Sequence, residues 1–219
     1  MKIKGAVFDL DGTLLDTLES IAKSGNEMLQ SLGYPKIDPK LYGIFAGDGA
    51  SILVERALRY SGDTALCYLE EAKKRYRECF NRFCSYHVQP YNGMLPLLES
   101  LKQKNLRLGV YTNKPHENAE KLVRQYFGET FFPYVFGQRE GSPQKPDPAG
   151  LLRMAQEWGI SPRECVYLGD TNVDMKTGKG ANCLTVGVLW GFREKEELLR
   201  NGADHVIAQP MDLIPLLKG

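Results

Sequence analysis

The feature that most constrains the fold is a regular alternation of helical and strand patterns after about residue 90. Segments with apolar residues at helical spacing alternate there with short apolar runs, which are 106–112 (LRLGVYT), 134–138 (YVFGQ), 165–170 (CVYLGD), 183–188 (CLTVGV) and 204–209 (DHVIAQ). Repeated strand–helix units favour a parallel sheet, because right-handed crossovers place the helices on both of its faces. The chain is therefore predicted to be an α/β protein.

The N-terminal part of the chain contains two kinds of sequence pattern. Residues 4–9 form another short apolar run and are predicted to be a strand of the same sheet. Residues 16–86 contain almost no strand-like segment and carry amphipathic helical patterns, for example over 49–62 and 64–87. We therefore expect a Rossmann-like core formed by residues 1–15 and 87–219, with an all-helical domain of residues 16–86 inserted into it.

Composition excludes several classes of partner. The 219 residues include 28 basic and 27 acidic ones, and no run of like charge indicates binding to nucleic acid or to an anionic membrane. No stretch approaches the roughly 20 apolar residues of a membrane span, and an acid follows the N-terminus too soon for a signal peptide. The five cysteines include no C-x-x-C pair, which suits reduced thiols. We expect a cytoplasmic protein, either a monomer or a homodimer.

Two acids, Asp9 and Asp11, follow the first predicted strand and are followed by Gly12 and Thr13. An Asp-Gly pair between apolar residues is also a strong hairpin signal, so this pattern alone is consistent with a plain turn. The apolar residues of 14–32 recur at helical spacing, however, and this predicts a strand, an acidic turn and a helix in succession.

Other polar side chains end or follow the predicted strands. Thr112 ends the strand 106–112, Asp170 ends the strand 165–170 and Asp174 follows one helical turn later. Lys145 follows the strand 134–138 and precedes a proline, which biases its backbone toward an extended conformation. Because ligands bind outside the carboxyl ends of the strands in open parallel sheets, we expect these side chains to converge with the two acids.

The predicted cluster has an excess of negative charge. Its four aspartates against Lys145 give −3 if all are ionised, and two carboxylates about 4 Å apart repel by roughly 4 kcal/mol at an effective dielectric constant near 20. Carboxylate and carbonyl oxygens select Mg²⁺, and a divalent cation beside a lysine, a threonine hydroxyl and helix N-termini suits a phosphoryl group. Thr112, Lys145 and Asp174 taken singly are explained as well by caps or surface groups, so the prediction depends on their joint placement.

In combination, these motifs resemble those of the haloacid dehalogenase superfamily of phosphatases, over essentially the whole chain. The segment 9–13 (DLDGT) is similar to the first motif of that superfamily, and Thr112 in VYTNK to the second. Lys145 in KPDP is similar to the third motif, and 169–174 (GDTNVD) to the fourth.

The resemblance implies a role for each residue. Asp9 would be the nucleophile that forms an aspartyl phosphate, and Asp11 would be the general acid and then the general base. The implied ligands of Mg²⁺ are Asp9, the main-chain carbonyl of Asp11, Asp170 and, directly or through water, Asp174. The implied ligands of the phosphoryl group are Thr112, Asn113 and Lys145.

Within the superfamily, the segment 186–217 most resembles the phosphoglycolate phosphatases, which implies a small phosphorylated metabolite as substrate. The helical insert resembles the small cap domain of the family. Its segment 47–51 (GDGAS) resembles the specificity loop of this group, in which Gly47 and Gly49 would offer backbone N–H groups to the substrate. A helix N-cap made of glycine and aspartate explains the same residues equally well.

Two other functions remain open. Dehalogenases and phosphonate-cleaving members lack an acid at the position of Asp11, but β-phosphoglucomutases keep both acids and commonly carry valine where Thr13 stands. A phosphomutase of that type is therefore the second hypothesis. The third is a phosphate-binding or regulatory protein that has the fold without turnover.

Overall fold

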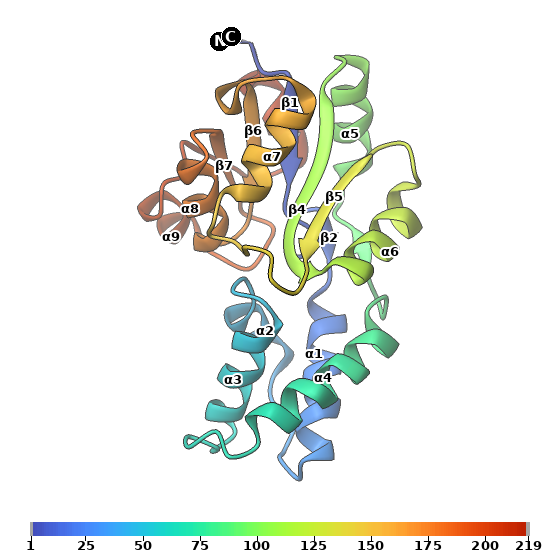
Figure 1. The fold of residues 1–219 in the computed structure, drawn as a ribbon, viewed down its shortest axis with the longest axis vertical. Helices are drawn as coiled ribbons and strands as arrows, with labels where there is room; N and C mark the ends of the chain where they lie inside the picture. The colour runs from blue at the N-terminus through green and yellow to red at the C-terminus, as the bar shows by residue number, and fades with distance from the viewer. Residues whose placement is uncertain (1, 218–219) are drawn as a thin grey trace. The chain divides into compact units, whose positions relative to one another are not determined.

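The computed structural model describes residues 2–217 and divides the chain into two compact units (Figure 1). The sheet unit contains the N-terminal residues up to 15 and the chain from residue 90 onward, and the helical unit contains residues 16–89. The division thus falls after residue 89, whereas the sequence placed it after residue 86. Near the boundary Val88 is buried, and His87 Nδ1 lies 2.6 Å from Glu19 Oε2, which also belongs to the helical unit.

The sheet unit is built on a six-stranded sheet of order β5–β4–β1–β6–β7–β8, in which neighbouring strands are parallel. The strands are β1 (Gly5–Phe8), β4 (Arg107–Pro115), β5 (Tyr134–Gln138), β6 (Cys165–Gly169), β7 (Leu184–Val188) and β8 (His205–Ile207). The helices are α5 (Met94–Gln103), α6 (His116–Phe127), α7 (Ala149–Trp158), α8 (Asn172–Gly180), α9 (Lys195–Arg200) and α10 (Leu213–Leu216). Helices cover both faces of the sheet (Figure 1). The α/β fold predicted from the sequence is confirmed.

Alternating side chains of the strands form the core. On one face Val7, Tyr111 and Tyr167 pack with Met154 and Trp158 of α7. The residues that alternate with them, including Ala6, Phe8 and Val110, are buried as well, because helices cover the second face too. The central strands are therefore apolar on both sides, and polar residues concentrate where the strands end.

Strand β4 is longer than the sequence predicted. It continues past Thr112 to Pro115, and its pairing with β5 shifts register between Tyr111 and Pro115. Such an irregularity changes the direction of the side chains that follow it. The register shift therefore falls on Thr112, Asn113 and Lys114, which carry the polar groups of this strand.

The helical unit contains α1 (Leu18–Ser31), α2 (Pro39–Phe45), α3 (Ala50–Tyr60) and α4 (Leu69–Phe83). Helix α2 was not predicted, because its seven residues are too few to show an apolar period. Its start does follow a recognisable pattern: the Asp38 side chain accepts a hydrogen bond from Lys40 N, and Pro39 occupies the first turn. Two short strands, β2 (Leu15–Asp16) and β3 (Gln89–Pro90), pair with each other.

The contact between α1 and α2 depends on Gly25. A Cβ atom at this position would lie 2.1 Å from the ring of Tyr42, which is fully buried and donates a hydrogen bond to Asn26 Oδ1. We expect Gly25→Ala to lower the free energy of unfolding of the helical unit by about 1 to 3 kcal/mol through overpacking. Urea unfolding followed by circular dichroism measures this effect.

The control is Gln30→Ala on the exposed side of the same helix. Alanine is a better helix former than glycine by about 1 kcal/mol, so propensity alone predicts that Gly25→Ala stabilises the protein. A stabilised Gly25→Ala variant would show that α1 and α2 separate easily.

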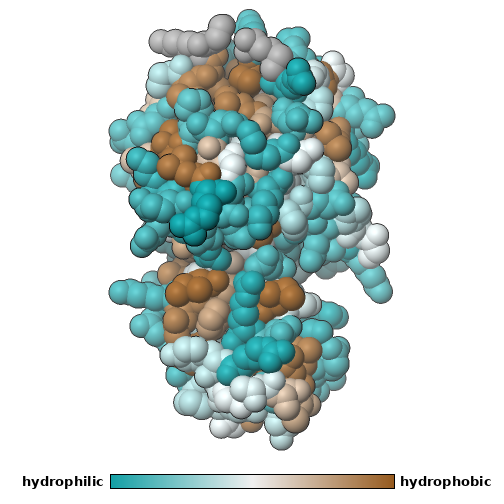
Figure 2. Space-filling view, turned by 90° about the vertical axis from the view of Figure 1, so that its left-hand side faces the viewer, coloured by the Kyte–Doolittle hydropathy of each residue, from teal (hydrophilic) through white to brown (hydrophobic). Residues whose placement is uncertain are grey.

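The face drawn in Figure 2 is largely hydrophilic, with separate hydrophobic areas on each unit. In the helical unit, Ile44 of α2 and Tyr60 of α3 are each 60% exposed. Within residues 2–217, no helix has both the length and the apolar character needed to cross a membrane.

Candidate active site

The polar residues of the sheet unit gather at the carboxyl ends of three adjacent strands, β4, β1 and β6. Asp9 directly follows β1, and its N–H donates a hydrogen bond to the carbonyl of Leu168 on β6. Asp170 directly follows β6, and Thr112 lies near the end of β4. The topology therefore brings together residues that are far apart in the sequence, as the parallel sheet predicts.

Three buried carboxylates form the centre of this site. Asp9, Asp170 and Asp174 each offer one oxygen, and these oxygens lie within 4.8 Å of one another. Burial raises the pKa of Asp9 to about 7, with a further contribution from Asp174, whereas Lys145 opposes the shift. Burial, and then the charges of Asp174 and Asp9, raise the pKa of Asp170 well above its usual value. A buried cluster of like charges with oxygen ligands has the chemistry of a site for a hard divalent cation.

Asp170 is held in one orientation by its neighbours. Thr13 Oγ1 donates a 3.0 Å hydrogen bond to Asp170 Oδ1, and Phe192 N donates one of 2.8 Å to Oδ2. A Cβ atom at Gly12 would lie 2.3 Å from Asp170 Oδ2, and one at Gly191 would lie 2.3 Å from Asp170 Cβ. The glycine of the DLDGT motif is therefore needed because the loop passes directly over this carboxylate.

Lys145 is buried among the same carboxylates. Its Nζ lies 2.9 Å from Asp9 Oδ1 and 2.7 Å from Asp174 Oδ1. Burial by itself lowers the pKa of this lysine, but the attraction of Asp174 and Asp9 outweighs it and the pKa is raised. The ammonium group therefore stays charged. The main chain of Lys145 exchanges two hydrogen bonds with the side chain of Asn113, at 2.8 and 3.0 Å, and the Lys145–Pro146 peptide is cis. The amide of Asn113 thus positions Lys145, a contact that the sequence did not predict.

Both carboxylate oxygens of Asp174 bind protein donors. Oδ2 accepts hydrogen bonds from Thr171 N and Oγ1, at 3.0 and 2.6 Å. Oδ1 accepts hydrogen bonds from Lys145 Nζ and from the phenol of Tyr167, the latter at 2.8 Å. Although burial raises the pKa of Asp174, Lys145 and these hydrogen bonds hold it below its usual value. Tyr167 was missed because its place in an apolar strand predicts only a core residue.

Asp11 is paired with a second buried lysine. Lys114 Nζ lies 2.6 Å from Asp11 Oδ1, and the side chain of Lys114 is 1% exposed while that of Asp11 is 20% exposed. Lys114 lies in the segment VYTNK, and its sequence pattern predicted no role for it. Including Lys114 corrects the charge of the cluster from −3 to −2, a charge that one divalent cation balances.

The remaining predicted residues lie in different units. Thr112 is buried in the sheet unit, and its Oγ1 accepts a 3.3 Å hydrogen bond from Lys114 N. Gly47 and Gly49 belong to the helical unit, where Gly49 is the N-cap of α3 and both glycines have positive φ. Asp48 between them forms a 2.7 Å ion pair with Arg56. The role of Gly47 and Gly49 in substrate choice stays a prediction.

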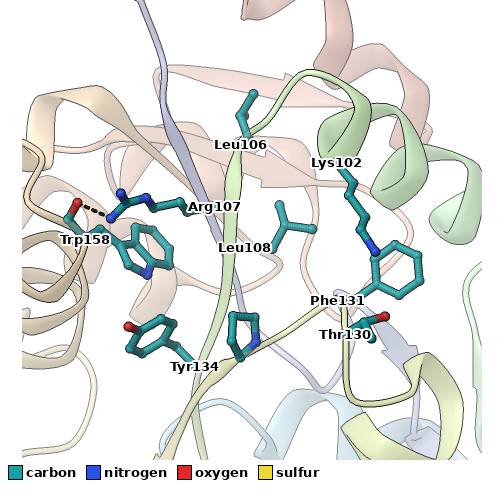
Figure 3. Close-up of a pocket in the computed structure, with 9 residues that line it drawn as sticks. Lys102, Leu106, Arg107, Leu108, Thr130, Phe131, Tyr134 and Trp158 are labelled. Carbon is teal, nitrogen blue, oxygen red and sulfur yellow. Dashed lines mark hydrogen bonds between the residues drawn. The ribbon is translucent and has the colours of Figure 1, made fainter.

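A separate cavity of about 360 Å³ lies at the amino end of β4, opposite to the end that carries the carboxylates (Figure 3). In Figure 3 Arg107 donates a hydrogen bond to the carbonyl of Trp158, and Lys102 lies 5.3 Å from the ring centroid of Phe131. The cavity contains none of the residues predicted for the site. The predicted site residues of the sheet unit therefore gather at the other end of the sheet from this cavity.

Comparison with known proteins identifies the family of the chain. The model of the family described as haloacid dehalogenase-like hydrolase matches residues 6–188. A phosphoglycolate phosphatase of Vibrio parahaemolyticus is 27% identical over 98% of this chain and 96% of its own length. An N-acetylmuramic acid 6-phosphate phosphatase of Pseudomonas putida is 30% identical over 97% of this chain and 95% of its own length.

Solved structures show the same fold. A crystal structure from Lactobacillus delbrueckii subsp. bulgaricus has a TM-score of 0.94 and 26% identity, with both chains covered completely. CbbY from Rhodobacter sphaeroides, solved in complex with phosphate, has a TM-score of 0.79 and 25% identity over 96% of each chain. The similarity therefore extends over both the sheet unit and the helical unit.

Proposed function

Because the chain belongs to the haloacid dehalogenase-like hydrolase family, we propose that it is a Mg²⁺-dependent phosphatase acting on a small phosphate ester of the phosphoglycolate type. The observation that carries the proposal is the joint placement of Asp9 and Lys145 among buried carboxylates, with Asp11 paired beside them. A binding protein would need a cation and a phosphate ligand, but it would not need both a nucleophile and a separate acid.

In the proposed first half-reaction, an oxygen of Asp9 attacks phosphorus and the P–O bond of the ester breaks. Asp11 donates a proton to the departing alkoxide. In the second half-reaction Asp11 takes a proton from water, which attacks the aspartyl phosphate and releases phosphate and the free carboxylate of Asp9. Thr112, Asn113 and Lys145 hold the phosphoryl group in this proposal, and Lys145 offsets its charge.

The donor set fits Mg²⁺. Asp9 and Asp170 would hold the cation together with the main-chain carbonyl of Asp11. Each oxygen of Asp174 already accepts two hydrogen bonds from the protein, whereas each oxygen of Asp170 accepts one. We therefore propose that Asp174 acts through water. When bound, the cation supplies positive charge that stabilises the transferring phosphoryl group.

The first test is metal-dependent release of phosphate from p-nitrophenyl phosphate. We expect activity to vanish after treatment with EDTA, to return with Mg²⁺ and to be inhibited by Ca²⁺. The looser coordination of Ca²⁺ by 6 to 8 ligands would allow Asp9 to bind it through both oxygens, which would leave no oxygen free to attack phosphorus. Mg²⁺ should also raise the melting temperature of the wild-type protein, by relieving repulsion in the cluster, and this shift should shrink in Asp170→Asn.

The matched control is Asp38→Asn in the helical unit, where asparagine caps the helix as well as aspartate does. Full activity in EDTA or with Ca²⁺ alone would contradict the metal assignment. A wild-type melting temperature that does not change when Mg²⁺ is added would also contradict the metal assignment, without any measurement of turnover.

The relatives support the proposed substrate class. The names of these relatives specify phosphoglycolate and N-acetylmuramic acid 6-phosphate. Each of these compounds carries a carboxyl group and a phosphate ester of a hydroxyl group. A panel of phosphorylated metabolites compared by kcat/KM tests this class. Transfer of phosphate between positions of a sugar phosphate, with little release of free phosphate, would favour the phosphomutase instead. Tight binding of phosphate with no turnover of any ester would favour the regulatory protein.

We propose further that residues 16–89 form a cap domain that excludes water from the reaction, with 47–51 contributing to substrate choice. The enzyme would work in the cytoplasm, since all five of its cysteines are free thiols, which suits a reducing compartment.

A further inference from the structure

We propose that Lys114 binds a carboxylate on the leaving group, so that the enzyme selects phosphate esters of short hydroxycarboxylic acids over uncharged alkyl phosphates. This inference rests on the proposed phosphatase function and deepens it, because it names the residue that sets the substrate class. It is carried by the position of Lys114 on β4, by its burial and by its contact with Asp11.

Lys114 is not a surface lysine. Its side chain is 1% exposed, and an ammonium group taken out of water costs free energy that only close negative partners offset. Asp11, the proposed acid of the reaction, is such a partner, with Lys114 Nζ 2.6 Å from its Oδ1. The cation is therefore fixed next to the group that handles the leaving oxygen.

Simple geometry then puts the leaving group within reach of Lys114. A general acid transfers its proton over a heavy-atom distance of about 2.6 to 3.2 Å, so the ester oxygen comes this close to Asp11. In an ester of a 2-hydroxycarboxylic acid, a carboxylate oxygen lies roughly 3 Å from the ester oxygen by covalent geometry alone. An ammonium group already in contact with Asp11 can therefore contact that carboxylate as well.

The charges favour the same arrangement. The ammonium group of Lys114 lies 2.6 Å from Asp11 Oδ1, so an anionic group that enters beside Asp11 comes close to a buried positive charge. A carboxylate on the leaving group is such an anion. Lys145 contacts Asp9 and Asp174, whereas Lys114 contacts Asp11. Lys145 is therefore placed to bind the phosphoryl group of the substrate, and Lys114 to bind its carboxylate.

Binding of two non-hydrolysable probes tests the proposal without turnover. 3-Phosphonopropionate has the shape of phosphoglycolate with a methylene group in place of the ester oxygen, and propylphosphonate replaces its carboxylate by a methyl group. We expect calorimetry with Mg²⁺ to show that the wild type binds the carboxylate probe about 10- to 100-fold more tightly. In Lys114→Met this preference should fall to within about 3-fold.

Lys176→Met removes one exposed lysine from α8 and should keep the wild-type preference. Lys114→Gln is the second variant, to be used if Lys114→Met melts below the assay temperature. Equal binding of the two probes by the wild type, or a preference that survives both Lys114 variants, would overturn the proposal.

The outcomes separate this proposal from the proposed function. If p-nitrophenyl phosphate is hydrolysed but the probes bind equally, the phosphatase assignment stands and the role of Lys114 is wrong. If the carboxylate probe is preferred through Lys114 but no ester is hydrolysed, the phosphatase assignment fails and the anion site remains.

Discussion

Asp9→Asn is expected to lower kcat for p-nitrophenyl phosphate by about 10⁴-fold or more and to leave the fold intact. An amide is a poor nucleophile, and nothing else in the described site occupies the same place at the end of β1. The amide oxygen can still accept the hydrogen bond from Leu10 N, which is 2.7 Å long in the structure. Steady-state kinetics measures the loss, and acid quenching followed by mass spectrometry shows whether any phosphoenzyme forms.

Asp38→Asn makes the same chemical change in the helical unit and should keep wild-type activity. Mass spectrometry of the purified Asp9→Asn protein excludes deamidation back to aspartate. Substantial turnover by verified Asp9→Asn protein, or a phosphoenzyme carrying its label on another residue, would remove Asp9 from the role of nucleophile.

The second large effect is expected for Asp11→Asn, and it should depend on the leaving group. An alkoxide such as that from phosphoglycolate needs a proton, whereas nitrophenolate leaves without one. We therefore expect kcat/KM, which reports the first half-reaction, to fall by about 10²- to 10⁴-fold for phosphoglycolate and far less for p-nitrophenyl phosphate. The aryl substrate should also give a burst of nitrophenol no larger than the enzyme concentration, because hydrolysis of the phosphoenzyme still needs a base.

Asparagine keeps the size of the side chain and an oxygen that can face Lys114, so the comparison isolates proton transfer. Equal losses on both substrates with no burst would mean that Asp11 mainly shapes the site and that another group carries the proton.

Much of the sheet could be predicted from the sequence because its strands are short apolar runs between helical patterns. The prediction for 134–138 coincides with β5, and those for the runs around β6 and β7 differ from the structure by a residue at one end. The convergence of Asp9 and Asp170 also followed from the parallel topology, because the carboxyl ends of β1 and β6 lie side by side. Because such strands are buried on both faces, they form continuous apolar runs, and their assignment as strands is clear.

The remaining features depend on partners far away in the sequence. Tyr167 has the pattern of a core residue, and only the folded structure shows its phenol against Asp174. Lys114 has the pattern of a polar residue after a strand, until the register shift of β4 buries it against Asp11. In both cases a local pattern fixes the element but not the direction and neighbours of a polar group. The same limit applies to the boundary after residue 89, because the contact of His87 with Glu19 joins residues 68 positions apart in the sequence.

The central position of β1 governs the order in which the chain can fold. Gly5 pairs with Arg107 on one side and with Cys165 on the other, so the first strand to be synthesised has both of its neighbours more than a hundred residues later. Such high contact order slows folding, because loop closure precedes any gain from the contacts. The helical residues 16–89 are contiguous and complete long before β6 is made. During synthesis the segment that carries Asp9 therefore cannot pair with β6 until residues 165–169 have been made, by which time the inserted helices are complete.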